Sequence, residues 1–327
     1  MQKLVTIFGG SGFVGRYVTQ RLAKEGWRVR VACRRPNEAH FVRMYGSVGQ
    51  VEPVFANIRD DDSVRAAVMG ADAVVNCVGI LAESGKNSFD AVQDEGAGRV
   101  ARISAAEGVE RLVHVSAIGA DAESDSAYGR SKARGEAGVM EHMPGAVILR
   151  PSIVFGPEDE FLNRFASMAR LAPVLPVVGP NTRFQPVHVD DVAAAAAMAV
   201  DGRASPGIYE LGGPDVDTFR ELMQTMLKVI RRRALILPVP FFGARIMAGL
   251  LDFGQTITAG IVHNGTLTRD QVRSLARDNV VSGEYPGFAE LGIEPVAMET
   301  ILPGYLWRFR PSGQYSDIKD SARNLKT

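Results

Sequence analysis

The chain has 327 residues, and its 37 basic and 37 acidic residues cancel to a net charge of zero, which argues against a nucleic-acid-binding protein that relies on bulk positive charge. The sequence has no run of about eighteen apolar residues and does not open with a basic segment followed by an apolar one. We therefore expect neither a membrane-spanning helix nor a signal peptide. A chain of this length can form one large domain and a smaller one.

The first recognisable feature is a short apolar strand, Leu4–Phe8, followed at once by a glycine-rich turn. The glycines fit two overlapping patterns, Gly10-x-Gly12-x-x-Gly15 and Gly9-x-x-Gly12-x-x-Gly15. Either pattern allows a tight turn, close approach of the backbone to a diphosphate, and close packing of the next helix on the strand. Glycine-rich turns also occur without ligands, but a strand before and a helix after favour a dinucleotide-binding turn.

Strands and helices alternate along the first 116 residues. The first expected helix buries Val14, Val18 and Leu22, which recur at i, i+4 and i+8. The expected strands cover 4–8, 28–33, 51–55, 73–78 and 112–116, and the expected helices cover 13–25, 61–68 and 89–107. This alternation predicts an α/β fold with a doubly wound, parallel Rossmann sheet.

Two arginines follow the second expected strand, Arg28–Cys33. An acidic residue at this position would bind the adenosine ribose 2′-hydroxyl of NAD, but Arg34 and Arg35 stand there instead. Arginine forms charge-assisted bonds with the 2′-phosphate of NADP, so the pair favours NADP, the alternative being two solvated surface arginines. After the third strand, we expect Asn57 and Ile58 to lie beside the adenine.

The cysteines and histidines show no metal-ligand pattern. Cys33 and Cys77 lie in separate apolar runs without a Cys-x-x-Cys spacing, so we predict two buried thiols in a reducing compartment. The five histidines have no spacing typical of metal ligands, and we expect no metal site; they are His40, His114, His142, His188 and His263.

A tyrosine and a lysine lie four residues apart, in Tyr128-Gly129-Arg130-Ser131-Lys132, and so share one face of a helix. A lysine ammonium near a phenol favours the phenolate and lowers its pKa, which would make Tyr128 a usable general acid or base. The alternative is a surface pair on an amphipathic helix. After five β/α units with a dinucleotide turn, the pair indicates a site.

Three motifs together resemble the extended and atypical short-chain dehydrogenase/reductase superfamily: the glycine turn, Tyr128-x-x-x-Lys132, and the run Leu149–Pro157. A narrower resemblance, over roughly the first two-thirds of the chain, is to the family of 39 kDa nucleotide-binding accessory subunits of respiratory complex I. The segments that carry it are Thr6–Gly9, Asn76–Gly79, His114–Ser116, Phe155–Ala166 and Gln185–Val192.

The resemblance implies a non-covalently held NADPH and a role in assembling or stabilising the hydrophilic arm of complex I near its membrane junction, without demonstrated turnover. We accordingly expect a peripheral protein on the cytoplasmic side of a bacterial inner membrane, with complex I subunits as partners. Matched motif by motif, the implied cofactor contacts are Gly9, Ser11, Gly12, Phe13, Val14, Gly15, Arg34, Asn57, Ile58, Val78, Gly79, Ser116, Tyr128, Lys132 and Pro151.

The chain departs from active members of the superfamily at the end of the fifth strand. These enzymes place a catalytic Ser or Thr there, usually in a serine-rich run. Here Ser116 is present, but Ala117 and Ile118 follow it. If the working hydroxyl belongs at either later position, the substrate carbonyl loses a hydrogen-bond donor, so the departure affects hydride transfer and not cofactor binding.

The second half fits a smaller, mainly helical region. Ile208–Leu211 is an expected strand, and Thr218 to Glu221 is a capping box that opens a helix ending near the Arg231–Arg233 triplet. The triplet is either a solvated face of the helix end or a contact site for anionic lipid or an acidic partner. The next segment, 234–262, is rich in apolar residues and is either a core or a docking surface for subunits or a membrane; its main apolar residues are Phe241, Phe242, Ile246, Met247, Leu250, Leu251 and Phe253.

The last segments are more polar. We expect a polar helix over 268–278 and a protein-contact segment over 302–309, where Tyr305, Trp307 and Phe309 alternate with arginines. Residues 314–327 are polar and are expected to become ordered only on a partner. The chain would then divide into a Rossmann domain, 1–230, and a smaller docking or substrate-like domain, 231–327. Segments within 155–185 would contribute to the smaller domain.

Three functions stay open at this point. The first is a complex I accessory subunit whose NADPH is structural. The second is an active NADP-dependent reductase or epimerase acting on a nucleotide-sugar or isoprenoid-like carbonyl, with Tyr128, Lys132 and Ser116 as the catalytic groups. The third is a redox-sensing regulator that binds NADP(H) and changes its affinity for a partner.

Overall fold

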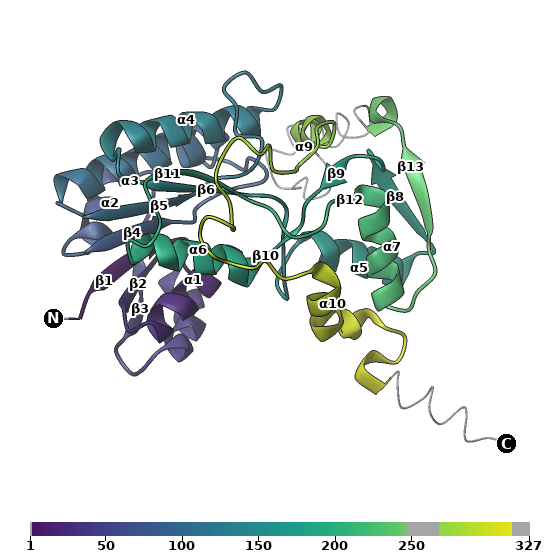
Figure 1. Ribbon diagram of the computed structural model, residues 1–327, viewed down its shortest axis with the longest axis horizontal. Helices are drawn as coiled ribbons and strands as arrows, with labels where there is room; N and C mark the ends of the chain where they lie inside the picture. Colours follow the sequence, from purple (N-terminus) through teal and green to yellow (C-terminus); the bar gives the residue numbers. More distant parts are fainter. Residues whose placement is uncertain (1, 245, 247–267, 316–327) are drawn as a thin grey trace.

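The computed structural model describes residues 2–244, 246 and 268–315. Its largest element is a seven-stranded parallel sheet in the order β11-β6-β5-β4-β1-β2-β3 (Figure 1). The strands are β1 (Leu4–Phe8), β2 (Arg28–Cys33), β3 (Val51–Phe55), β4 (Ala73–Asn76), β5 (Arg111–Val115), β6 (Val147–Pro151) and β11 (Gly207–Leu211).

Helices cover both faces of this sheet (Figure 1). One layer holds α1 (Phe13–Lys24) and α6 (Val189–Val200), and the other holds α2 (Asp61–Val68), α3 (Glu95–Ala106) and α4 (Ala127–His142). Apolar side chains pack between the sheet and each helix layer, so the central strands are buried on both faces, which is why their sequences are continuous apolar runs. The predicted α/β class with a doubly wound parallel sheet is confirmed.

Local boundaries differ from the prediction in a few places. The fourth strand ends at Asn76 and not at Val78. The helix expected from Phe89 opens with a π-helical turn, Asp90–Asp94, before α3 begins. The polar helix expected over 268–278 is shorter than predicted: α9 covers Arg269–Ser274.

A second apolar core lies beside the sheet and is built from segments far apart in the sequence. It joins Phe155 and Leu162 to Phe219 and Leu302. Its main elements are α5 (Phe161–Leu171), β8 (Val174–Val178), α7 (Phe219–Val229), β13 (Leu235–Val239) and α10 (Met298–Leu306). The predicted capping box of Thr218 and Glu221 opens α7. The division of the chain near residue 230 stays a prediction, since this core draws on segments from both sides of that position.

Smaller elements complete the described part of the chain. They are two-stranded pairs, a 3-10 helix after β2, and short turns near the end of the described chain: β7 (Val154–Phe155) with β10 (Val187–His188), β9 (Arg183–Phe184) with β12 (Asp217–Thr218), Pro36–Tyr45, Trp307–Phe309 and Gly313–Tyr315. From α9 the chain passes β11 and α6 before it reaches α10 (Figure 1). Among the helices described here, none has the length and apolarity needed to cross a bilayer.

The aromatic segment near the end packs inside this protein, which corrects the expectation of a contact segment. The Tyr305 ring is buried and its hydroxyl donates to Asp159 Oδ2 at 2.8 Å. The Phe309 ring is also buried in the second core, so only Trp307 of the three aromatics is open to solvent. Tyr, Trp and Arg are common wherever two surfaces meet, and here Tyr305 and Phe309 pack within the second core of the same chain.

The apolar stretch from residue 234 exposes much of its described part. In β13, Leu235 is 65% and Leu237 48% exposed, and Phe242 is 77% exposed. Exposed apolar side chains of this kind favour the docking-surface interpretation over the core interpretation. The rest of that prediction lies outside the described residues, namely Met247, Leu250, Leu251 and Phe253, as do the terminal residues 316–327.

Candidate nucleotide-binding site

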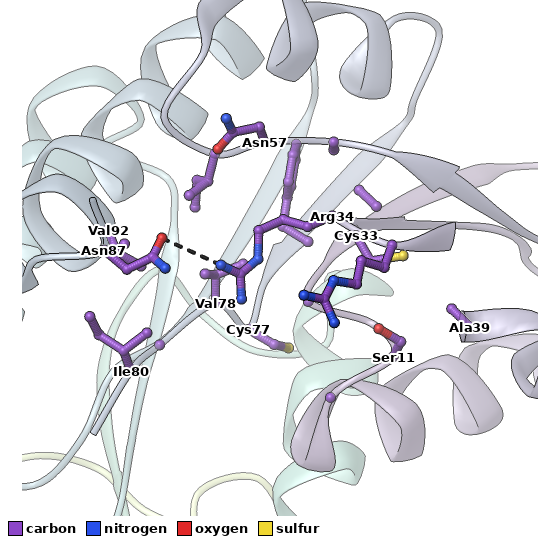
Figure 2. A pocket seen from close by; sticks show the side chains of 18 of the residues that line it. Ser11, Cys33, Arg34, Ala39, Asn57, Cys77, Val78, Ile80, Asn87 and Val92 are labelled. Carbon is purple, nitrogen blue, oxygen red and sulfur yellow. Dashed lines mark hydrogen bonds between the residues drawn. The ribbon is translucent and has the colours of Figure 1, made fainter. Parts of the chain in front are cut away.

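A cavity of about 710 Å³ opens at the carboxyl ends of β1, β2 and β4 and of the segment after β3. Ligands of open α/β sheets bind at this edge, where the strand order reverses, and the volume lies within the range of small-molecule sites. Of the predicted cofactor residues, nine line it: Gly9, Ser11, Gly12, Arg34, Arg35, Asn57, Ile58, Val78 and Gly79. Figure 2 shows side chains converging on it from several strands.

The glycine turn forms the floor of the cavity, and its geometry chooses between the two glycine patterns. Gly9 has a φ of +73°, which a side chain rarely allows. A Cβ on Gly15 would lie 2.2 Å from the Gly9 carbonyl oxygen, so the helix can approach the turn this closely only with glycine. Gly9 and Gly12 line the cavity, whereas Gly10 is buried against Thr19 and Val31. The structure therefore favours Gly9-x-x-Gly12-x-x-Gly15.

The first turn of α1 offers free backbone donors at this floor. The helix begins at Gly12 without a side-chain cap, and no acidic residue lies in its first turn. The first N–H groups of a helix lack intrahelical partners and carry the positive end of the helix dipole. Phe13, Val14 and Gly15 are the first residues of α1 and are not lining residues of the cavity, so they would contribute to a diphosphate through their backbone N–H groups alone.

The two arginines lie at the mouth, with different partners. Arg34 reaches from the end of β2 toward Asn87, whose Oδ1 accepts from Arg34 Nη1 at 3.4 Å (Figure 2). Arg35 Nη1 lies 3.3 Å from Glu38 Oε1, in an ion pair exposed on both sides. Both guanidinium groups suit a phosphate, but Arg34 is the one that spans toward the opposite wall.

Several lining residues carried no sequence signal. Cys33 and Cys77 are half-buried and line the cavity, so the expectation of two buried thiols holds only in part, although burial raises the pKa of both thiols. Arg59 also lines it and donates from Nη1 to the Lys86 carbonyl oxygen at 2.7 Å. With Asn87, this bond ties the 84–87 hairpin to the site. The positions of Cys33 and Cys77 at the ends of expected strands could have identified them as lining residues, whereas no sequence pattern marks the 84–87 hairpin.

Helix α4 places Tyr128 and Lys132 behind the wall of the cavity. Lys132 is buried, and its Nζ donates to the Val115 carbonyl oxygen at 3.2 Å. The same Nζ lies 3.4 Å from where a Cβ on Gly79 would be, and Gly79 lines the cavity. The Tyr128 ring packs edge-on against Phe89 with centroids 5.9 Å apart. The structure thus brings the predicted pair to the end of the cavity where β4 and β5 finish.

Burial dominates the ionisation of both groups. It lowers the pKa of Lys132 to about 8, against the opposing effect of the nearby Glu136 carboxylate. Burial also raises the pKa of Tyr128 to about 12, the opposite of the direction expected from its lysine neighbour. The Lys132 Nζ lies 6.0 Å from the Tyr128 ring centroid, and at this separation the loss of solvation outweighs its charge. Tyr128 is therefore a neutral phenol at neutral pH.

Ser116 lies one residue beyond the carbonyl that Lys132 binds. Its Oγ is buried and has no hydrogen-bond partner among the described residues. Beyond it, Ala117 and Ile118 bring no hydroxyl, and the Ile118 N–H donates to the Pro151 carbonyl oxygen at 3.0 Å. Ser116 and Pro151, like Tyr128 and Lys132, do not line the cavity itself. The site thus keeps one candidate hydroxyl, and a serine-rich run is absent.

A buried histidine lies next to this serine and was not predicted as part of the site. The His114 Nδ1 lies 3.2 Å from Asn76 Nδ2, and Asn76 Oδ1 accepts from the Val78 N–H. That bond fixes the Asn76 amide as the donor to His114. Burial, together with Lys132, lowers the pKa of His114 to about 3, so the ring is neutral.

Comparison with known proteins is consistent with this geometry. The model of the NAD dependent epimerase/dehydratase family matches residues 5–212. An Arabidopsis thaliana protein named NADH dehydrogenase [ubiquinone] 1 alpha subcomplex subunit 9, mitochondrial, is 34% identical over 95% of this chain and 79% of its own length. The mouse protein of the same name is 32% identical over 99% of this chain and 85% of its own length.

A second kind of relative is named as an enzyme. The ceramide reductase of Caulobacter vibrioides is 32% identical over 78% of this chain and 79% of its own length. Among solved structures, the UDP-glucose 4-epimerase of Thermus thermophilus in complex with NAD covers 94% of this chain and 99% of its own, with a TM-score of 0.67 and 20% identity. At this identity, the match shows the fold alone.

Proposed function

Because this chain belongs to the NAD dependent epimerase/dehydratase family and carries its nicotinamide dinucleotide site, we propose that it is an NADPH-binding accessory subunit of a respiratory NADH:quinone oxidoreductase. In this role the nucleotide holds the domain together and undergoes little or no turnover. The observation that carries the proposal is the similarity to named complex I subunits over 95–99% of the chain.

Arg34 is the main support for NADPH over NADH. The residue directly after β2 is Arg34 and not an acidic residue, and the Arg34 guanidinium lies on the cavity wall next to where an adenosine ribose is expected. A 2′-phosphate there would replace Asn87 as the partner of Arg34 Nη1, exchanging a 3.4 Å contact with a neutral amide for a charge-assisted bond.

The degraded serine run supports a structural cofactor. The residues that would hold the diphosphate are complete, while the positions after Ser116 are apolar. Burial raises the pKa of Tyr128 to about 12, which makes its phenol a weaker proton donor to a substrate carbonyl than an ordinary tyrosine. A nucleotide bound only to the native state stabilises the fold by mass action, by about 2.7 kcal/mol at a hundred times its Kd.

The docking surface that we propose for other subunits lies on the second core. It consists of exposed apolar side chains on neighbouring elements: Leu171, Val174, Leu235, Leu237 and Phe242. Exposed apolar patches of this kind mark interaction sites. With this surface against the hydrophilic arm near its membrane junction, the protein would lie peripherally on the cytoplasmic side of a bacterial inner membrane.

Co-purification tests this proposal. Native membranes are solubilised in mild detergent, the NADH:quinone oxidoreductase is isolated through a tag on one of its other subunits, and this chain is quantified by mass spectrometry. We expect one copy per complex, and Leu235→Asp combined with Leu237→Asp should release it. If the untagged wild-type chain never co-migrates with the complex, the proposal is wrong.

The similarity to ceramide reductase favours a second candidate, an NADP-dependent reductase of a lipid carbonyl. Tyr128 would donate a proton to the carbonyl oxygen, Lys132 would bind the nicotinamide ribose, and Ser116 would orient the carbonyl. NADPH oxidation with long-chain keto-lipids, abolished by Tyr128→Phe, would support it. No turnover across a broad panel of carbonyls would exclude it.

A further inference from the structure

The N-terminus of α4 is bound by a carboxylate from a distant part of the chain. Asp270, on α9, accepts from the Ala127 N–H through Oδ1 at 2.7 Å and from the Tyr128 N–H through Oδ2 at 3.0 Å. The Ser126 hydroxyl also donates to Asp270 Oδ2, at 2.8 Å. Ser126 Oγ in turn accepts from the Gly129 N–H, so the first donors of α4 are satisfied by two side chains.

Asp270 is itself held in place from several directions. Thr268 and Gln271 form a capping box that starts α9, and Ser274 Oγ donates to Ser126 Oγ at 3.1 Å. Farther along the segment, the Asn279 Oδ1 accepts from the Ser152 hydroxyl and the Ile153 N–H. The segment therefore lies firmly on the strand ends, and the Asp270 carboxylate is aimed at α4.

The bond to the Tyr128 N–H bears on the site. It fixes Tyr128, and Lys132 follows one helical turn later on the same face, with its Nζ 3.4 Å from where a Cβ on the lining residue Gly79 would be. A negative charge at a helix N-terminus also stabilises the helix through its dipole. Loss of this carboxylate would leave Ala127 and Tyr128 N–H groups without an acceptor and let the first turn of α4 shift.

We infer that Asp270 is a positioning residue that sets Tyr128 and Lys132 against the nicotinamide half of the bound nucleotide. The inference rests on the proposed function insofar as it requires NADPH to bind in this cavity. The inference goes beyond the proposed function, because the nicotinamide end of the site would depend on Asp270 in the C-terminal region, whereas the diphosphate end would depend on the glycine turn.

Two ligands separate the ends of the site. NADPH occupies both, whereas 2′,5′-ADP carries the adenosine half and its 2′-phosphate but has no nicotinamide. For Asp270→Ala we expect about a tenfold weaker NADPH affinity, the effect of a lost helix cap, and 2′,5′-ADP affinity within about twofold of wild type, both by calorimetry. The fluorescence of bound NADPH should also shift toward that of the free nucleotide, because it reports the surroundings of the nicotinamide.

Asp278→Ala is the matched control. Asp278 anchors the same segment to the Arg183 N–H and Nε, both at 2.8 Å, without contacting α4, so this variant should leave both affinities unchanged. Asp270→Glu keeps a carboxylate and should restore part of the NADPH affinity. If Asp270→Ala does not fold, Asp270→Asn takes its place, because it keeps the side-chain volume and one acceptor oxygen. For this variant we expect a smaller loss of NADPH affinity and again no change in 2′,5′-ADP affinity.

The outcomes distinguish the two claims. Unchanged NADPH affinity in Asp270→Ala, or equal weakening of both ligands, would overturn the positioning role while leaving the nucleotide site in place. Wild-type protein that binds neither NADPH nor 2′,5′-ADP would overturn both the proposed function and this inference.

Discussion

Two helices begin beside the cavity, and their N-termini are completed in opposite ways. The first turn of α1 has a glycine at its start, no side-chain cap and no acidic residue. The first turn of α4 has Ser126 at its start and the Asp270 carboxylate across its N–H groups. The first N–H groups of every helix lack intrahelical partners, and in α4 side chains of this protein accept from them, so the uncapped N-terminus of α1 is the one left for an external anion.

In the nucleotide site that we propose, this contrast gives the two ends a different origin. The diphosphate end is made of backbone from one short stretch of sequence. The nicotinamide end is made of side chains whose position depends on residues more than 140 positions away, as the Tyr128 N–H to Asp270 bond shows. Changes at α1 should therefore abolish binding of the whole nucleotide, while changes at α4 should affect one half of it.

The largest expected effect is at the turn before α1. In Gly15→Ala the new methyl group would lie 2.2 Å from the Gly9 carbonyl oxygen and 2.7 Å from the Gly10 Cα, so the turn must move. We expect NADPH and 2′,5′-ADP binding to fall together by more than about a hundredfold, with about 1–3 kcal/mol lost from the free energy of unfolding. Calorimetry and urea unfolding measure the two effects.

Gly304→Ala is its control, because a Cβ at Gly304 inside α10 would meet nothing within 4 Å. This variant should bind normally and unfold at the same or slightly higher urea concentration. Tight NADPH binding by Gly15→Ala would show that the α1 terminus does not carry the diphosphate.

An intermediate effect is expected at Arg34. Removal of its guanidinium in Arg34→Ala should weaken NADPH by about ten- to a hundredfold, the range for charge-assisted hydrogen bonds, and should change NADH by less than about twofold. Arg43→Ala removes an arginine from an exposed pair with Glu52 and should change neither affinity. An unchanged preference in Arg34→Ala would make Arg34 a surface arginine only.

The smallest effect is the pH dependence at α4. Burial lowers the pKa of Lys132 to about 8, and the protonated amine is the form that donates to ribose hydroxyls. NADPH binding favours that form and raises this pKa, so affinity should fall by up to about tenfold as pH rises through 8 and beyond. Lys132→Met should bind more weakly at pH 7 with a flat profile. A wild-type profile that is also flat would mean that Lys132 does not touch the nucleotide.

The sequence predicts the nucleotide-binding half well because its signals are local. In each β/α unit the apolar strand, the turn and the helix period lie within about thirty residues, and β1, β2 and β3 have the predicted ends. The turn at Gly9 to Gly15 is a feature of one such unit. Its conformation could be predicted because the positions of the glycines and of the first backbone N–H groups of α1 depend only on neighbouring residues.

The missed features are those built by long-range contacts. Asn87 reaches the cavity through a hairpin without a motif, and Asp270 reaches α4 from 142 residues away. Tyr305 was predicted to belong to a protein-contact segment because aromatic residues interleaved with arginines are common at interfaces, but its hydroxyl has a buried partner in Asp159. The pKa of Tyr128 was predicted in the wrong direction because burial, which no local pattern shows, outweighs the charge of Lys132.

The nucleotide content of the intact complex tests the account most directly. The NADH:quinone oxidoreductase is purified with this chain, allowed to turn over NADH, and extracted before and after for mass spectrometry of the released nucleotides. We predict one NADPH per copy of this chain, unchanged in amount and redox state after turnover. Finding no NADPH, or finding it converted to NADP+ while NADH is consumed, would contradict a nucleotide that holds the domain together without reacting.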